Sequence, residues 1–139
     1  LEQRNYNRAI ETFTAVISSS SAYEKAYVGR ASAFIEKGLL ELAERDLLRA
    51  RQLRPEDAVI YYHMGRIYIE RGMLDEAINA YTEAIRLRPD FALAYNNRGV
   101  AHAERGDTMK ALMDFKKALS LKPDSIEALH NLQKMGPLE

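Results

Sequence analysis

The stretch AVIYYHMGRIYIERGMLDEAINAYTEAIRLRPDF, residues 58–91, carries the pattern that decides the fold of this 139-residue chain. Small, aromatic and turn residues mark positions 4, 8, 11, 20, 24, 27 and 32 of the stretch, which are Tyr61, Gly65, Tyr68, Ala77, Tyr81, Ala84 and Pro89. Gly72, at position 15, divides the stretch into two halves. Residues three, four and seven apart share one face of a helix, so each half predicts an amphipathic helix.

Turn residues indicate where these two helices end. Gly72 can take the left-handed conformation that ends a first helix, and Asp75 and Glu76 then place negative charge in the first turn of the second. Pro89 ends the second helix, and we expect Asp90 to cap the next one. The unit is therefore a helical hairpin, whose small residues let its two helices approach closely.

The same pattern recurs every 34 residues along the chain. Complete copies occupy residues 24–57, 58–91 and 92–125, and residues 1–22 align with the second half of a copy. Residues 126–135 start a further copy, which is either a capping helix or a truncated repeat. A single hairpin cannot cover its own apolar stripe, so we expect the copies to stack into one all-α domain over residues 1–139.

This arrangement of residues at a 34-residue period resembles the tetratricopeptide repeat family over nearly the whole chain. The resemblance implies a right-handed α-solenoid of antiparallel helix hairpins. Departures from the family pattern are few. His102 replaces an aromatic residue, and Arg30 and Arg98 stand at position 7, where leucine is usual. None of these departures threatens the predicted fold.

Composition narrows the classes of function. Apolar residues make up 47% of the chain and charged residues 29%, as in a soluble globular protein. Lysine plus arginine equals aspartate plus glutamate at 20 each, which argues against nucleic-acid or membrane binding. No signal peptide or membrane span is predicted and cysteine is absent, so we expect an intracellular, cytoplasmic protein. Because the chain begins with Leu1 rather than methionine, we expect a segment of a longer protein.

In the resembled family, the first helices of successive hairpins line a concave groove. The resemblance implies that a peptide ligand contacts groove positions on these helices and on the terminal one: Lys25, Ser32, Tyr62, His63, Arg66, Asn96, Asn97, His130, Asn131 and Lys134. This mixture of amide, imidazole, aromatic and basic groups suits an extended peptide backbone better than a point charge. Two alternatives stay open here. His63 and His130 either contact a ligand or are merely exposed, and Asn97 and Asn131 either form a peptide-gripping ladder or simply tolerate exposure.

The sequence predicts no enzyme. The histidines at 63, 102 and 130 lack the spacing that places two metal ligands on one helical face, and we expect no metal, no cofactor and no catalytic residue. The recurring glutamate, cation and glycine at residues 36–38, 70–72 and 104–106 end the first helices, where a cation favours the negative end of the helix dipole.

Some members of the family bind an acidic C-terminal tail through a clamp of lysine, asparagine and arginine side chains. Read from the central hairpin, the clamp positions hold Tyr62, Arg66, Asn97, Glu127 and Asn131, of which only Asn97 fits. Glu127 would repel the carboxylate that a lysine should hold. We therefore do not expect this chain to bind such a tail.

The function that follows from the resemblance is a non-enzymatic protein-interaction module, which binds a peptide or a partner's helix in its groove. Two alternatives are a structural scaffold or self-association segment, and the targeting arm of an enzyme whose catalytic domain lies outside this chain. We also expect self-association through residues 1–17, because the helix there has no partner helix in its own hairpin and would leave Ile10, Phe13 or Ile17 partly exposed.

Overall fold

The computed structural model describes residues 2–136, which form eight α-helices and no strand. The helices are α1 (Glu2–Ser19), α2 (Glu24–Glu36), α3 (Leu40–Leu53), α4 (Ala58–Glu70), α5 (Leu74–Leu87), α6 (Ala92–Arg105), α7 (Thr108–Leu121) and α8 (Ile126–Lys134). In these residues, none of the helices is both long and apolar enough to cross a membrane.

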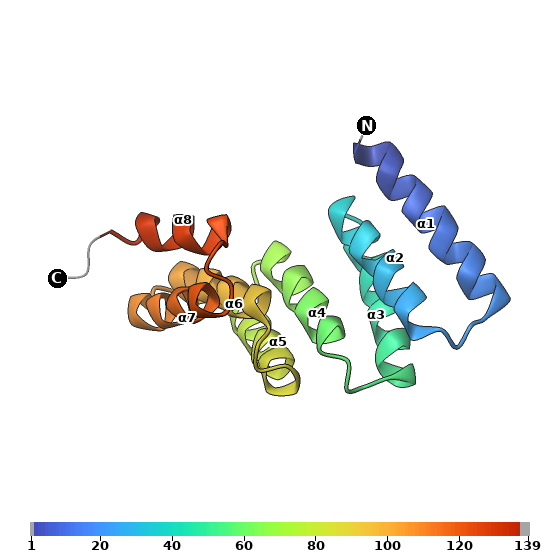
Figure 1. Ribbon diagram of the computed structural model, residues 1–139. Helices are drawn as coiled ribbons and strands as arrows, with labels where there is room; N and C mark the ends of the chain where they lie inside the picture. The colour runs from blue at the N-terminus through green and yellow to red at the C-terminus, as the bar shows by residue number, and fades with distance from the viewer. Residues whose placement is uncertain (1, 137–139) are drawn as a thin grey trace.

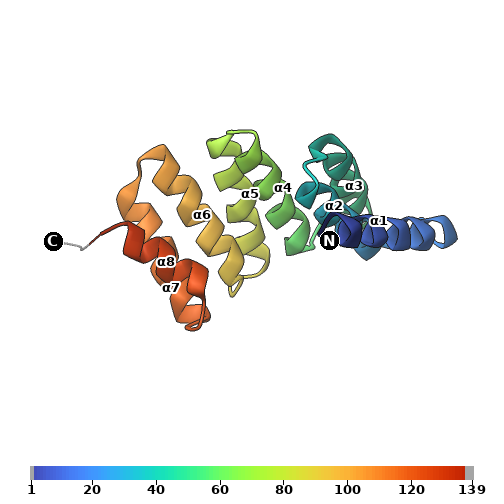
Figure 2. The same ribbon diagram turned by 90° about the horizontal axis from the view of Figure 1, so that it is seen from above.

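The helices pair into hairpins, and the hairpins stack into a single array. The pairs α2–α3, α4–α5 and α6–α7 pack most extensively, with α1 against α2 and α8 against α7 (Figure 1). Seen from above, α1 and α8 lie toward opposite ends of the array (Figure 2). The predicted all-α solenoid of stacked helix hairpins is confirmed.

A glycine forms the corner of each hairpin. Gly38, Gly72 and Gly106 have φ values of +78°, +73° and +94°, in the left-handed region that glycine enters without a side-chain clash. In the central hairpin, the Gly72 N–H donates to the Ile69 carbonyl at 3.0 Å, and the N–H of the next residue donates to the Tyr68 carbonyl at 2.9 Å. The predicted role of Gly72 is confirmed.

The residue that caps α6 differs from the one expected. The predicted cap Asp90 is wrong, because Phe91 is the N-cap of α6 and no side chain accepts a hydrogen bond there. Asp57 and Ser125 occupy the position of Phe91 in the neighbouring copies. The Asp57 carboxylate accepts from the Val59 N–H at 3.0 Å, and the Ser125 hydroxyl likewise caps α8. The capping position is therefore position 34 of the pattern, one residue later than expected.

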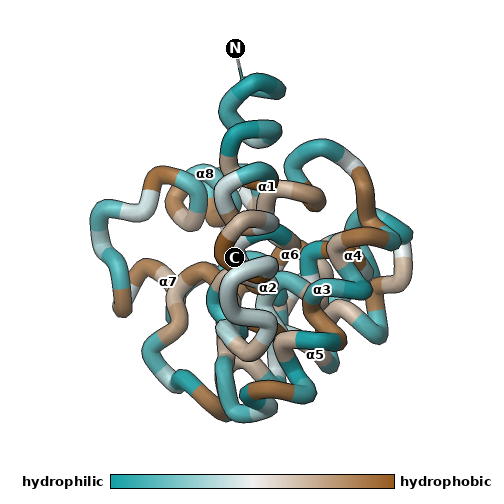
Figure 3. Tube along the Cα trace, turned by 90° about the vertical axis from the view of Figure 1, so that its right-hand side faces the viewer, coloured by the Kyte–Doolittle hydropathy of each residue, from teal (hydrophilic) through white to brown (hydrophobic). Residues whose placement is uncertain are grey.

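The closest approach within a hairpin is made by an aromatic ring on a glycine. A β-carbon added at Gly65 would lie 2.5 Å from Tyr81 Cε1, and one added at Gly99 would lie 2.7 Å from Phe115 Cε1. Only glycine fits these two places, since such contacts are far below van der Waals distance. Figure 3 shows apolar and polar segments alternating along the helices, as this one-sided packing requires.

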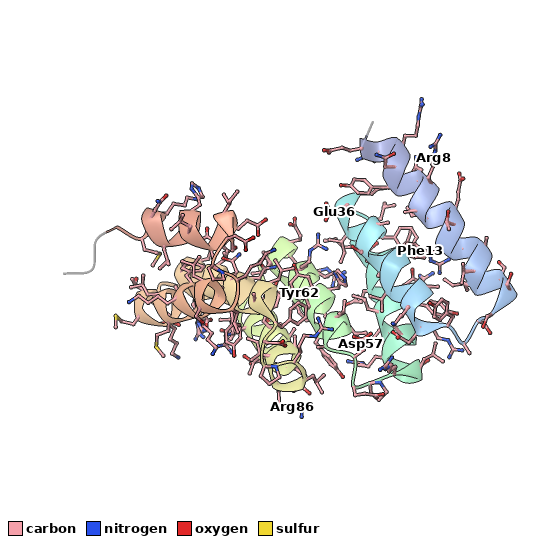
Figure 4. The ribbon with its side chains drawn as sticks, viewed as in Figure 1. Arg8, Phe13, Glu36, Asp57, Tyr62 and Arg86 are labelled. Atoms are coloured by element: carbon pink, nitrogen blue, oxygen red, sulfur yellow. The ribbon has the colours of Figure 1, made fainter. Side chains whose placement is uncertain are left out.

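Helix α1 docks on α2 through the same kind of contact. A β-carbon added at Gly29 would lie 2.3 Å from Phe13 Cζ, and Figure 4 shows Phe13 directed from α1 toward α2. Ile17 packs against the core cluster shared by α2, α3 and α4. No residue of α1 is fully buried, so α1 is the most open of the longer helices.

Arg30 and Arg98, at the position where leucine is usual, each join three helices. The Arg30 guanidinium donates two hydrogen bonds to Asp46 at 2.7 Å and one to Thr14 at 3.1 Å, which ties α1, α2 and α3 together. Arg98 makes the same contacts with Asp114 at 2.8 Å and Thr82 at 3.2 Å, tying α5, α6 and α7.

The corresponding positions between these two ties are apolar. They hold Leu48, Met64 and Ala80, on α3, α4 and α5. The two kinds of contact therefore alternate along the array, with an arginine tie in every second hairpin. Paired charges and apolar side chains are interchangeable here, because a buried ion pair adds little net stability over apolar packing of the same volume.

Enlarging a small residue that is buried between the helices of a hairpin should destabilise the fold. Ala77 is fully buried, so Ala77→Leu should lower the free energy of unfolding by about 1 to 3 kcal/mol through overpacking. Asn79→Leu, at an exposed position of the same helix, is the control and should change it far less. Urea unfolding followed by circular dichroism measures both, and equal losses would contradict the register of the repeat.

Breaking an arginine tie should cost more than replacing it. Asp46→Ala should lower the free energy of unfolding by about 1 to 3 kcal/mol, because it leaves the Arg30 guanidinium without its acceptor. The double variant Arg30→Met with Asp46→Ala copies Met64 and Ala80 of the central hairpin. We expect the double variant to regain most of the free energy of unfolding that Asp46→Ala loses, as measured by urea unfolding. A double variant as unstable as Asp46→Ala alone would show that apolar side chains cannot replace the ion pair.

Candidate peptide-binding groove

A cavity of about 180 Å³ opens between α4 and α6, at positions that the resemblance assigns to the groove. Its lining consists of Arg66, Ile69, Glu70, Tyr81, Asn97 and Val100. One repeat later, a cavity of about 260 Å³ lies over the corresponding positions of α6 and α8, with Asn131 and Lys134 in its lining. Successive first helices thus present a hollowed face, whose floor holds the ring at position 24 of each hairpin, Tyr81 or Phe115.

Two further cavities lie nearer the start of the first helices. Lys25 lines one of about 350 Å³, together with Arg54 and Arg88. Asn96 lines another of about 260 Å³, together with Glu127. The two cavities differ in charge, because cations predominate around the first and the second mixes both signs.

Side-chain amides form a chain of hydrogen bonds across the groove. The Asn131 amide donates to Asn96 Oδ1 at 2.9 Å, and the Asn96 amide donates to Asn97 Oδ1 at 3.4 Å. The Asn97 amide in turn lies 3.4 Å from the Tyr62 hydroxyl and 3.5 Å from the Tyr81 hydroxyl. The first bond is short and its donor is tied down, whereas those of Asn97 are long and weak. The Asn97 donor is therefore held only by weak contacts within the protein.

Tyr62 belongs both to the groove and to the packing beneath it. Its ring centroid lies 5.1 Å from that of Phe91 and 6.0 Å from that of Tyr81, and Figure 4 shows it on α4 in the middle of the array. Burial raises the pKa of the Tyr62 hydroxyl above its usual value, with the carboxylate of Glu127 acting in the same direction. The charge of Arg66 acts in the opposite direction and outweighs that of Glu127.

His63 lies beneath the groove surface, with 8% of its area exposed. Arg66 Nη1 lies 3.3 Å from His63 Nδ1, and because a guanidinium only donates, this ring nitrogen accepts and the proton is on Nε2. Burial, and then the charge of Arg66, lower the pKa of His63 to about 4. Arg66 also pairs with Glu36 of the preceding first helix. His63 is therefore neutral at physiological pH, and Arg66 joins α4 to α2.

The structure brings together only some of the residues predicted from the resemblance. Tyr62, Asn96, Asn97 and Asn131 form one connected cluster. His63 and Arg66 adjoin it, because the His63 ring centroid lies 5.2 Å from that of Tyr62 and Arg66 lines the same cavity as Asn97. Of the remaining predicted residues, Lys134 shares a cavity with Asn131, and Lys25 lines a separate one. Ser32 and His130 line none of these cavities. Asn96 is only 5% exposed, so its amide ties α6 to α8 more than it faces solvent.

Sequence reasoning assigned Tyr81 to packing alone and missed its hydroxyl. The ring does pack on Gly65, but its oxygen reaches the cavity lining and Asn97. The corresponding residues of the other copies are Phe13, Leu47 and Phe115, none of which has a polar side-chain atom. This difference between the copies could have indicated a polar role for the Tyr81 hydroxyl. Among the described residues, no group of three or more acidic, histidine or cysteine side chains is arranged to hold a metal ion.

Comparison with family models identifies the repeat along most of the chain. Models described as tetratricopeptide repeat match residues 1–58 and 92–125, and a model described as TPR repeat matches residues 65–106. A search of curated protein sequences finds no match.

Solved structures share the fold at low sequence identity. The crystal structure of TTC0263, a thermophilic TPR protein of Thermus thermophilus, has a TM-score of 0.84 at 23% identity over 94% of this chain and 72% of its own. The crystal structure of MamA has a TM-score of 0.79 at 24% identity, over 94% and 76%. The second TPR domain of human RPAP3, in complex with the HSP70 peptide SGPTIEEVD, has a TM-score of 0.71 at 26% identity, over 78% and 91%.

Acid should weaken the fold through His63. The unfolded chain takes up a proton at this residue as the pH falls below about 6.5, whereas the folded chain does so only near pH 4. Stability from this group is therefore complete above pH 6.5 and lost on the way to pH 4, by roughly 2 to 4 kcal/mol. We expect the stability advantage of the parent chain over His63→Asn, measured by urea unfolding, to shrink by that amount between pH 7.5 and pH 4. An advantage that is equal at both pH values would contradict the buried, neutral state of His63.

Proposed function

Because the chain belongs to the tetratricopeptide repeat family, we propose that it is a non-enzymatic protein-interaction module that binds an extended peptide in the groove between α4 and α6. The observation that carries this proposal is the state of Asn97. Its amide lines the cavity, and its two contacts to tyrosine hydroxyls are 3.4 and 3.5 Å long. A peptide carbonyl at normal distance would satisfy this donor better than the protein does.

The surroundings of Asn97 suit a peptide backbone. Tyr62 supplies a half-buried ring at the same place, and Ile69 and Val100 supply apolar area. Rigid aromatic side chains beside a few directional polar groups are the usual makeup of peptide-binding surfaces. Asn97, Ile69 and Val100 line one cavity, and Tyr62 adjoins it through its contact with Asn97. Ser32 and His130 lie outside this cavity and are expected to contribute only to a long peptide.

The peptide that we propose is not an acidic C-terminal tail. A similar domain, the first TPR of Spaghetti (RPAP3), is bound to the HSP90 peptide SRMEEVD, with a TM-score of 0.76 at 20% identity over 81% of this chain and 89% of its own. In this chain, Glu127 stands where the clamp of such domains would need a lysine to hold a carboxylate. Repulsion between carboxylates argues against that ligand class.

Self-association through residues 1–17 is a separate proposal. Helix α1 has no fully buried residue, so a second molecule could cover its open side. Phe13 is a poor probe because its ring lies on Gly29 and holds α1 to α2. Ile10→Glu is the better variant, and sedimentation at several concentrations would reveal a dimer that it dissociates.

An intracellular location also remains a proposal.

Binding selections test the groove directly. Peptides selected from a random displayed library on the immobilised parent chain should lose affinity roughly two- to tenfold for Asn97→Ala, the range expected for one hydrogen bond. Asn79→Ala, on an exposed face outside the groove, is the matched control and should bind unchanged. Fluorescence polarisation of labelled peptides gives both affinities, and circular dichroism confirms that helicity is kept. Peptides that bind both variants equally well would place the site elsewhere.

A further inference from the structure

The groove carries an ion pair between two successive first helices, and the corresponding positions one repeat later lack the cation. Glu36, at position 13 of its copy, pairs with Arg66, at position 9 of the next copy. One repeat later the same two positions are Glu70 and Val100, which line the cavity between α4 and α6 together. Val100 has no charge, so the partner that the preceding copy supplies to its glutamate is absent here.

The neighbouring cavity restores a cation at the corresponding position. Glu104 and Lys134 stand one further repeat along, and both line the cavity between α6 and α8. Position 9 thus reads arginine, valine and lysine in successive first helices. Among residues 2–136, no cationic side chain lies within ion-pair distance of Glu70. Its carboxylate is exposed at the rim of a cavity whose other charged group, Arg66, already has a partner.

The shape and chemistry of this cavity fit a long basic side chain. Ile69, Val100 and the Tyr81 ring offer apolar surface for a methylene stem, and Glu70 stands at the rim for the charged end. Arg66 lines the same cavity, but its guanidinium is paired with Glu36 and directed at His63.

We propose that the cavity between α4 and α6 binds a lysine or arginine side chain of the peptide ligand, with its charged group on Glu70 and its stem over Ile69 and Val100. This inference rests on the proposed function, because the basic residue arrives on the peptide whose backbone Asn97 holds. The basic side chain of the ligand thus pairs with Glu70 in the way that Arg66 of the protein pairs with Glu36.

Short peptides test this proposal by isolating the side chain. The probes are Ac-Gly-Lys-Gly-NH2, its norleucine analogue, which keeps the stem without the charge, and its glutamate analogue. Titration of the ¹⁵N-labelled chain should shift the amide signals of Glu70, Asn97 and Val100, with the lysine probe binding more tightly than the other two. Glu70→Gln should weaken the lysine probe roughly two- to fivefold, the range of a partly exposed ion pair. Glu76→Gln, on an exposed site of α5 outside the groove, should leave its affinity unchanged.

A second variant supplies the missing cation from within. Val100→Arg copies Arg66 at the position one repeat earlier, which the fold already accommodates, and should abolish the preference for lysine over norleucine. The proposal is overturned if the norleucine or glutamate probe binds as well as the lysine probe, or if the preference survives in Val100→Arg.

Library-selected peptides separate this inference from the proposed function. If selected peptides require Asn97 but bind equally after their lysines and arginines become norleucine, the groove binds peptides and the inference is wrong. If no peptide is selected while the lysine probe still requires Glu70, the proposed function is wrong and the basic-side-chain site stands.

Discussion

The contact of an aromatic ring with a glycine fixes the geometry on which the rest of the array depends. Tyr81 on Gly65 and Phe115 on Gly99 set how closely the two helices of a hairpin approach, and no other side chain fits beneath the ring. The contact recurs in α4–α5 and α6–α7, whereas α2–α3 has the smaller pair Leu47 and Ala31 at the same two positions. The groove is a consequence, because first helices that recur at one spacing must share a face.

Only a few positions of each copy are needed for this packing, and the others are free to differ. Position 7 is one example, where successive copies hold Arg30, the apolar Met64 and Arg98. Position 9 is another, where Arg66 is followed one copy later by Val100. The backbone stays the same while its chemistry changes from copy to copy. The chemistry of the groove therefore differs between copies while the packing of the helices stays the same.

The sequence predicted the fold well because its determinants are local and repeated. Gly72 needs a left-handed corner whatever surrounds it, and the spacing of small and aromatic residues identifies the buried faces. The site was less predictable, since it depends on contacts between copies. The burial of His63 follows from the neighbouring Arg66 and Tyr62 side chains, and the polar role of Tyr81 follows from its reach to the next hairpin. No periodic pattern reports such distances.

The alternation of ties also makes the array mechanically uneven. The junction between α2–α3 and α4–α5 lacks the arginine tie and holds Leu48, Met64 and Ala80 instead, yet on the groove side it is crossed by the Glu36–Arg66 pair. Apolar side chains can slide past one another, whereas an ion pair resists separation. A bend that widens the groove at this junction must break the pair, and a bend that narrows it need not. Opening of the groove at this junction therefore separates a charge pair as well as apolar side chains.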